Sequence, residues 1–145
     1  MKKLKTFALL LALIMSMQVA ACAAVTPDIN VQTASVQPRG AYLMGGGCTI
    51  SGGGGYVMVD AHTDAYYEAY KLKVELTVFK EEYANIWVEV WSDDVTTFYD
   101  YSVGYPTTTI SVDSGYNYKI EATHTVTHNG ITETCFSDAK KVYVW

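Results

Sequence analysis

The alternation of apolar and polar side chains between residues 71 and 78 is the strongest constraint that this sequence places on its fold. Leu72, Val74, Leu76 and Val78 form an apolar row, and the residues between them are charged or polar. Because successive side chains of a β-strand point to opposite faces, this pattern predicts a strand that covers a core on one side only. It therefore favours an antiparallel sheet with one solvated face.

Two further segments show the same alternation, and a turn motif follows the second one. The apolar rows are Val57, Val59 and Ala61 in one segment, and Tyr118, Ile120, Ala122 and Val126 in the other. Asn129-Gly130 then fits a two-residue type I′ hairpin, since both residue types accept positive φ. This turn predicts the pairs His128 with Ile131, Val126 with Glu133, and His124 with Cys135.

The segment from Ile86 to Trp91 also alternates, and its pairing with the first row can be inferred. A five-residue loop over residues 81–85 would place Val78 opposite Val88 and Leu76 opposite Val90, so that the apolar rows meet. This register predicts that Trp87 and Trp91 lie on the outer face of the sheet.

Residues 41–145 have the composition of one all-β domain. They are rich in Val, Thr, Tyr and Ile, and the glycine runs at 45–47 and 52–55 are interpreted as flexible turns. The segment Gly115-x-x-Tyr118-x-Ile120-x-Ala122 resembles the penultimate strand of immunoglobulin-like and fibronectin type III domains, in which the tyrosine hydroxyl binds nearby backbone. The resemblance implies an Ig/fibronectin-like β-sandwich of about seven antiparallel strands.

The N-terminal segment is interpreted as an export signal. Three lysines among the first five residues precede an uncharged stretch from Phe7 to Met17. This stretch is too short to span a membrane as a helix, which needs about 20 residues. Residues 1–23 are therefore predicted to be a signal peptide and residues 24–40 a flexible leader, and the protein is expected outside the cell.

Two processing routes remain open at the small-residue tract that ends this signal. Val19-Ala20-Ala21-Cys22 is similar to a lipobox, in which Cys22 would carry a lipid that holds the protein to the membrane. Ala21-Cys22-Ala23 also fits ordinary cleavage before Ala24, which would release the protein. Membrane association is expected only on the first route.

Removal of the signal makes the remaining chain strongly acidic. It leaves 7 basic against 15 acidic residues, a net charge of −8 with neutral histidines. Phosphate backbones repel such a surface, which argues against nucleic-acid binding.

Two cysteines, Cys48 and Cys135, remain after either cleavage. An exported protein permits disulfides, so a Cys48–Cys135 bridge is predicted, with two free buried thiols as the alternative. A zinc site built from both cysteines with His124 and His128 is a weaker hypothesis, because Cys-x-x-Cys spacing is absent. Asp60, His62 and Asp64 share one strand face, but their spacing of nearly 7 Å favours a solvated edge over a metal site. No metal or cofactor is expected.

Aromatic residues are the most suggestive functional feature. In the inferred register, Trp87 and Trp91 lie beside Phe79 on the outer face, and Tyr66, Tyr67 and Tyr70 extend that surface from a preceding loop. Exposed aromatic rings near acids are typical of sugar-binding or protein-contact surfaces. The alternative is that another part of the chain covers this face.

The sequence contains no Gly-x-Ser-x-Gly elbow and no phosphate-binding glycine loop. We therefore expect no enzyme and no catalytic residues, but a binding or interaction module for a glycan or a cell-surface protein. The alternatives are a secreted structural or peptide-like effector and, third, a carboxylate-dependent hydrolase.

At the level of the whole chain, the motifs Gln37-Pro38-Arg39-Gly40 and Gly130-Ile131-Thr132-Glu133 resemble those of an uncharacterised family of small exported proteins from Firmicutes. This resemblance implies an exported β-sandwich and supplies no active-site residues.

Overall fold

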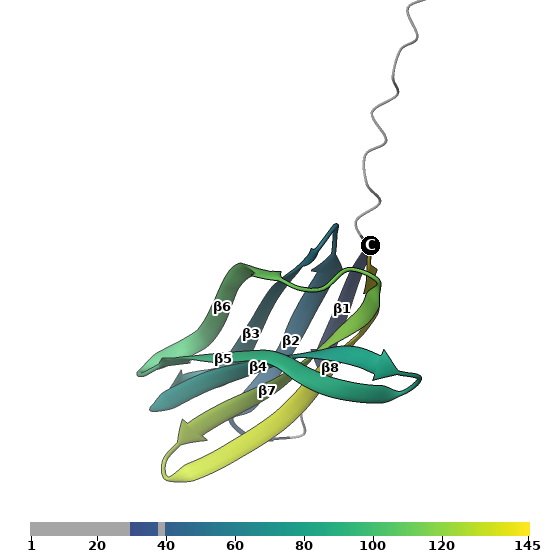
Figure 1. Ribbon diagram of the computed structural model, residues 1–145. Helices are drawn as coiled ribbons and strands as arrows, with labels where there is room; N and C mark the ends of the chain where they lie inside the picture. The colour runs from purple at the N-terminus through teal and green to yellow at the C-terminus, as the bar shows by residue number, and fades with distance from the viewer. Residues whose placement is uncertain (1–29, 38–39) are drawn as a thin grey trace, which may run out of the picture.

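The computed structural model describes residues 30–37 and 40–145 as two packed β-sheets (Figure 1). The predicted signal peptide and Cys22 lie outside the described residues. The strands are β1 (Asn30–Val36), β2 (Leu43–Gly52), β3 (Tyr56–Ala69), β4 (Lys71–Tyr83), β5 (Ile86–Thr97), β6 (Asp100–Ser111), β7 (Tyr116–His128) and β8 (Ile131–Val144). The described residues form no helix, so none of them belongs to a helix that could cross a membrane.

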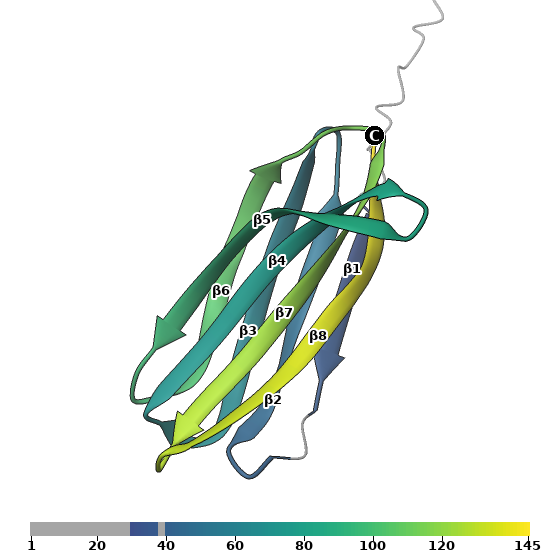
Figure 2. The same ribbon diagram turned by 60° about the horizontal axis from the view of Figure 1, so that its bottom comes forward.

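Two packed antiparallel sheets confirm the predicted β-sandwich, with eight described strands where about seven were predicted. One sheet has the order β1-β2-β3-β6 and the other β5-β4-β7-β8, with all pairs antiparallel (Figure 2). If β2 is taken as strand A, the second sheet reads C′-C-F-G and the first contains A-B-E. Strand β1 is an addition beside A.

Strand β1 lies inside the segment that was predicted to be a flexible leader, so that prediction is wrong for residues 30–36. The strand pairs with β2 from Asn30–Gly52 to Val36–Gly46. Its side chains are exposed or half-buried, and Ala34 packs against the core. An edge strand of this kind buries too little apolar surface to show a clear alternation, which is why composition alone suggested a tether.

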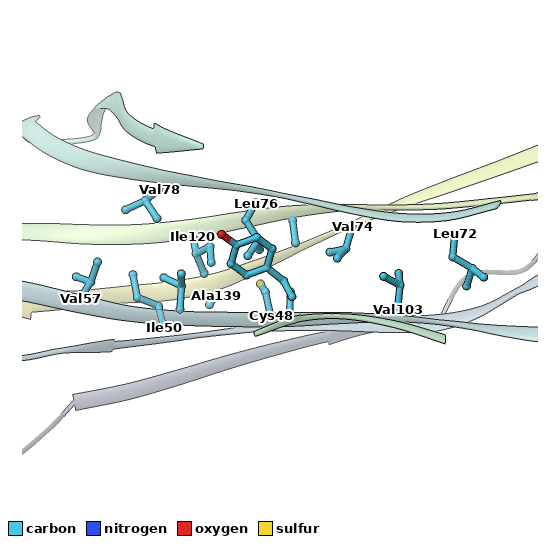
Figure 3. Packing of buried hydrophobic residues seen from close by; sticks show 14 of the residues in the cluster. Cys48, Ile50, Val57, Leu72, Val74, Leu76, Val78, Val103, Ile120 and Ala139 are labelled. Atoms are coloured by element: carbon cyan, nitrogen blue, oxygen red, sulfur yellow. The ribbon is translucent and has the colours of Figure 1, made fainter. Parts of the chain in front are cut away.

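The predicted apolar rows form the core between the sheets. Figure 3 shows Leu72, Val74, Leu76 and Val78 of β4 opposite Ile50 and Val57 of the other sheet. The four β4 side chains are fully buried, and so are the rows of β3 and β7. Burial of a side chain of this size contributes about 1.5–3 kcal/mol, so these rows supply much of the driving force for folding.

The β7–β8 hairpin and the tyrosine corner both form as predicted. Asn129 and Gly130 have φ values of 49° and 77°, and the three predicted cross-strand pairs are present. The Tyr118 hydroxyl donates a hydrogen bond of 2.8 Å to the carbonyl oxygen of Asp113, before the strand begins. Gly115, with a φ of 89°, makes the turn between them.

The predicted β4–β5 register is wrong, and the error changes which side chains face the core. A turn of only two residues joins Tyr83 to Ile86, and Val78 pairs with Trp91 in place of Val88. Relative to the predicted register, this shift turns Trp91 inward. Val90 has no partner in β4, because Val78 pairs with Trp91 and the next β4 residue, Phe79, pairs with Glu89. Val90 therefore forms a β-bulge, at which the register changes.

The glycine run at residues 45–47 belongs to β2 and is not a turn, contrary to prediction. A Cβ atom on Gly46 would lie 2.4 Å from Nδ1 of His124, so the imidazole packs directly on the strand backbone. Absence of a side chain at Gly46 therefore makes room for a buried ring.

Candidate binding surface at one end of the sandwich

Aromatic side chains from four separate segments meet at one end of the sandwich. At this end β3 passes to β4 through Tyr70, β5 passes to β6 through Phe98 and Tyr99, and β7 turns into β8 (lower end in Figure 2). Tyr42, just before β2, lies there too, because β2 begins opposite the last part of β3. These connections correspond to the B–C, C′–E and F–G loops of an Ig-like sandwich. We call this region the aromatic end.

Most of these rings are exposed to solvent. Between 52% and 67% of the surface of each of six residues is accessible: Tyr66, Tyr67, Tyr70, Phe98, Tyr99 and Tyr101. Single exposed aromatics are common on soluble proteins, but six of them at one end make this region a candidate interaction site.

Several of the rings form two clusters, which differ in their packing geometry. In one cluster Tyr70 contacts Phe98 at 5.8 Å and Tyr99 at 5.5 Å, with interplanar angles of 71° and 86°. In the other, Tyr42 lies 4.9 Å from His128 at an interplanar angle of 42° and 6.4 Å from Tyr67 at 68°, and Tyr67 stacks on His128 at 27°. Edge-to-face and offset-stacked aromatic pairs are worth about 0.5–1.5 kcal/mol each beyond the area that they bury, so the rings stabilise one another.

Backbone hydrogen bonds connect the segments that carry the rings. The Tyr99 amide donates to the carbonyl oxygen of Tyr70 at 3.4 Å, and the Tyr66 amide donates to that of Tyr42 at 2.9 Å. Tyr99 has a φ of 55°, which is uncommon for an aromatic residue and costs about 1–2 kcal/mol relative to the right-handed region. Strained backbone positions of this type cluster at binding sites.

Glu133 of β8 fastens the segment that precedes β2. Its carboxylate accepts hydrogen bonds from the backbone amides of Ala41, Tyr42 and Leu43 at 2.8, 3.0 and 2.8 Å. These hydrogen bonds, chiefly that from Leu43, lower the pKa of Glu133. The contact positions Tyr42 within the aromatic end.

The aromatic residues predicted as one surface are divided among three places. Phe79 and Trp87 lie on the outer face of the sheet, where the Lys119 ammonium group is 5.1 Å from each ring centroid. Trp91 packs against the core and contacts Tyr105 of the opposite sheet at 5.9 Å, so its predicted outer position is wrong.

Tyr66, Tyr67 and Tyr70 belong to the aromatic end and not to the Trp87 face. Tyr66 and Tyr67 lie within β3, where a loop had been predicted, and Tyr70 alone joins β3 to β4. The sequence prediction missed Tyr42, Phe98 and Tyr99. The run Phe98-Tyr99-Asp100-Tyr101 was a visible signal, but only the fold brings it beside Tyr70.

The predicted Cys48–Cys135 disulfide is not formed, and both cysteines are free thiols. The β8 strand places Ser137 beside Cys48, with Ser137 Oγ donating to Cys48 Sγ at 3.3 Å. Cys135 lies two residues earlier on the same face, a step of nearly 7 Å along a strand.

The four-residue zinc hypothesis also fails on geometry. Both ring nitrogens of His124 are already in contact with hydroxyls, Nδ1 with Thr63 at 2.9 Å and Nε2 with Ser137 at 2.8 Å. His128 lies apart from them, against Tyr42. Within the described ranges, no group of three or more His, Cys, Asp or Glu side chains is arranged to hold a metal ion.

The Asp60, His62 and Asp64 row is exposed or half-buried on the outer face of β3, which is an interior strand of its sheet and not the predicted edge. Nε2 of His62 lies 3.6 Å from the carboxylate of Asp64, and this exposed contact contributes little to stability.

An acidic hollow of about 330 Å³, lined in part by Glu75, Glu89 and Asp94, lies on the second sheet. Lys73 forms ion pairs with Glu75 at 2.8 Å and with Asp94 at 3.6 Å. These ion pairs offset part of the negative charge of the hollow.

Comparison with known proteins found no matching family model and no significant match among curated sequences. The resemblance to small exported proteins therefore stays a prediction. The fold and the aromatic end are the basis for a functional inference.

Proposed function

We propose that this chain is an exported, non-catalytic binding module whose aromatic end contacts a protein on a cell surface. The export signal predicted from residues 1–23 is the basis for placing the protein outside the cell. The interaction is assigned to the aromatic end, and not to the Trp87 sheet face, because Trp91 packs inward and Lys119 covers part of the remaining rings.

One observation carries the proposal: six aromatic side chains at one end are each more than half exposed, and backbone hydrogen bonds connect the segments that carry them. Tyrosine offers a large amphipathic contact area at a low cost in conformational entropy, and for that reason it is abundant in the binding loops of antibodies. Rigid display of such side chains lowers the entropic cost of binding further.

The ring geometry favours a protein partner over a glycan. Sugars stack on flat aromatic faces, whereas the Tyr70 ring stands nearly perpendicular to those of Phe98 and Tyr99. A cluster with both faces and edges exposed fits the irregular surface of a protein. The exposed carboxylates of Glu68 and Asp100 near the rings favour a partner that is not itself acidic.

A binding assay on intact bacterial cells tests this function. Fluorescently labelled protein is titrated onto cells that are untreated, treated with protease to remove surface proteins, or treated with periodate to oxidise glycans. We expect saturable binding that protease abolishes and periodate leaves unchanged. Loss with periodate alone would assign the surface to glycans and contradict the protein partner.

Paired variants identify the surface. Combined Tyr70→Ala and Tyr99→Ala substitutions are expected to weaken binding by tenfold or more, since buried tyrosines at interfaces are often worth about 2 kcal/mol. The control combines Tyr83→Ala and Tyr143→Ala, two exposed tyrosines near the opposite end. Equal loss in both pairs would remove the basis for assigning the aromatic end.

A further inference from the structure

The four edge strands of the two sheets differ in how they are protected against pairing with other strands. An exposed edge presents unpaired backbone amides and carbonyls, and natural proteins block it with charges, proline, bulges or short length. In this sandwich the edges are β1 and β6 in one sheet, and β5 and β8 in the other.

Three of these edges carry such protection. Strand β5 contains three acidic residues, including Asp93 and Asp94, and a bulge at Val90. Strand β6 contains Pro106 and a register shift against β3. Strand β8 contains charged residues, among them Asp138 and Lys141, and a register shift against β7.

Strand β1 is the shortest of the described strands, but it has none of the charges, proline or bulges of the other edges. Its seven residues, Asn-Val-Gln-Thr-Ala-Ser-Val, include no charge, proline or glycine, and it pairs with β2 without any register shift. Within residues 30–37 and 40–145, no strand pairs with its outer edge. Val31 is 53% exposed, so apolar surface accompanies the unpaired backbone.

We propose that this edge is a self-association site, at which β1 of a second copy pairs antiparallel and joins two four-stranded sheets into one. The symmetry of such a dimer restricts the register. Residues that face the core must pair with core-facing residues of the second copy, because a one-residue slip would exchange the two faces.

The register that keeps all seven pairs has Thr33 at its centre, opposite Thr33 of the second copy. Val31 then pairs with Ser35, Gln32 with Ala34, and Asn30 with Val36. No pair brings like charges together, and a threonine pair across an antiparallel ladder is favourable. Self-pairing of β5 would instead oppose acidic side chains, so β1 is the edge that fits a second copy.

A site-directed cross-link tests this register. At the centre of an antiparallel pair, the two Cβ atoms of residue 33 lie about 4.5–5.5 Å apart, close to the distance that a disulfide needs. Protein that begins at Ala24 contains every described strand. In it, Thr33→Cys is expected to form covalent dimers under mild oxidation. The matched control is Asn30→Cys, whose two copies would be six strand positions apart and should not cross-link.

The oligomeric state gives an independent readout. Sedimentation of the unmodified protein between about 10 and 200 µM should show a monomer–dimer equilibrium. Thr33→Lys places two charges at the dyad and is expected to weaken the dimer by roughly tenfold or more, whereas Thr33→Val should preserve it. Circular dichroism checks that the strand content is unchanged.

A monomer throughout this range would overturn the proposal. A dimer that Thr33→Lys leaves intact would also overturn it, since the contact would then lie on another face. Because Thr33 is remote from the aromatic rings, loss of cell binding in the Tyr70/Tyr99 variant and loss of dimer in Thr33→Lys are separate results.

Discussion

The imidazole of His124 lies on the backbone of Gly46, so close that a Cβ atom at Gly46 would be 2.4–2.8 Å from three ring atoms. The ring cannot move aside easily, because Thr63 and Ser137 contact its two nitrogens. Two strands from opposite sheets thus approach each other through a glycine and a buried polar ring.

Substitution of Gly46 by alanine should therefore destabilise the protein by about 1–3 kcal/mol, the usual cost of overpacking a core. Urea unfolding followed by tryptophan fluorescence measures the change. Gly104→Ala is the matched control, since the nearest atom to its added methyl group would be 4.0 Å away. The control should be neutral or slightly stabilising. Equal stability of the Gly46→Ala variant and the parent would contradict the packing described here.

Removal of the Tyr118 hydroxyl should weaken the corner between β6 and β7. Tyr118→Phe deletes the hydrogen bond to the carbonyl oxygen of Asp113 in a side chain that is 1% exposed. We expect a loss of about 0.5–1.5 kcal/mol in the free energy of unfolding. Tyr143→Phe, on an exposed ring, serves as the control. An effect no larger than that of the control would show that this hydrogen bond contributes little.

Acid should destabilise the fold through His124. Burial lowers the pKa of His124 to about 4, whereas an unfolded histidine has a pKa near 6.5. Between these pH values the unfolded chain binds more protons, so stability falls as the pH drops from about 6.5 to about 4. The expected loss from this residue is about 3 kcal/mol. In an NMR titration, the His124 ring signals should stay constant from pH 8 to about pH 5; a midpoint near 6.5 would contradict its burial as a neutral ring.

Glu133 should add a second, distinguishable acid sensitivity. Its pKa is lowered by the backbone amides of residues 41–43, so its stabilising effect is present above the unfolded pKa of about 4.3 and is lost as the pH falls through the folded value. The difference in unfolding free energy between the parent and Glu133→Gln should therefore be largest near pH 7 and shrink toward pH 3. Glu68→Gln, on an exposed carboxylate, is the matched control.

The two thiols should differ in reactivity. Cys48 is 1% exposed, and burial raises the pKa of its thiol. In protein that begins at Ala24, a thiol reagent should modify Cys48 only after denaturation, whereas the half-buried Cys135 should react sooner. Recovery of no reactive thiol in denaturant without reductant would restore the disulfide prediction.

Local patterns in the sequence predicted the parts of the fold that depend on neighbouring residues. The row from Leu72 to Val78 and the Asn129-Gly130 turn are set by strand periodicity and by backbone conformation, and both are present. The tyrosine corner was found for the same reason, since Tyr118 and Asp113 are only five residues apart.

The remaining errors arise from contacts between distant segments. In β5, both Val90 and Trp91 are apolar, and only the bulge and the contact with Tyr105 decide that Trp91 faces inward. Tyr70 and Tyr99 are 29 residues apart, and their contact depends on the hydrogen bond between two connections. No periodic pattern in the sequence predicts this contact.

The ends of the described chain and the aromatic rings lie at opposite ends of the sandwich. Asn30 opens β1 opposite Gly52, and Val144 closes β8 opposite Tyr116, so both ends of the described domain lie at the end of the sandwich away from the aromatic rings (Figure 2). A chain held to a membrane through the segment before Asn30 would stand with its tyrosines outermost, at the greatest reach from the bilayer. Lipidation at Cys22 and simple release would then differ in more than location, because only the anchored form would be attached at the end opposite its tyrosines.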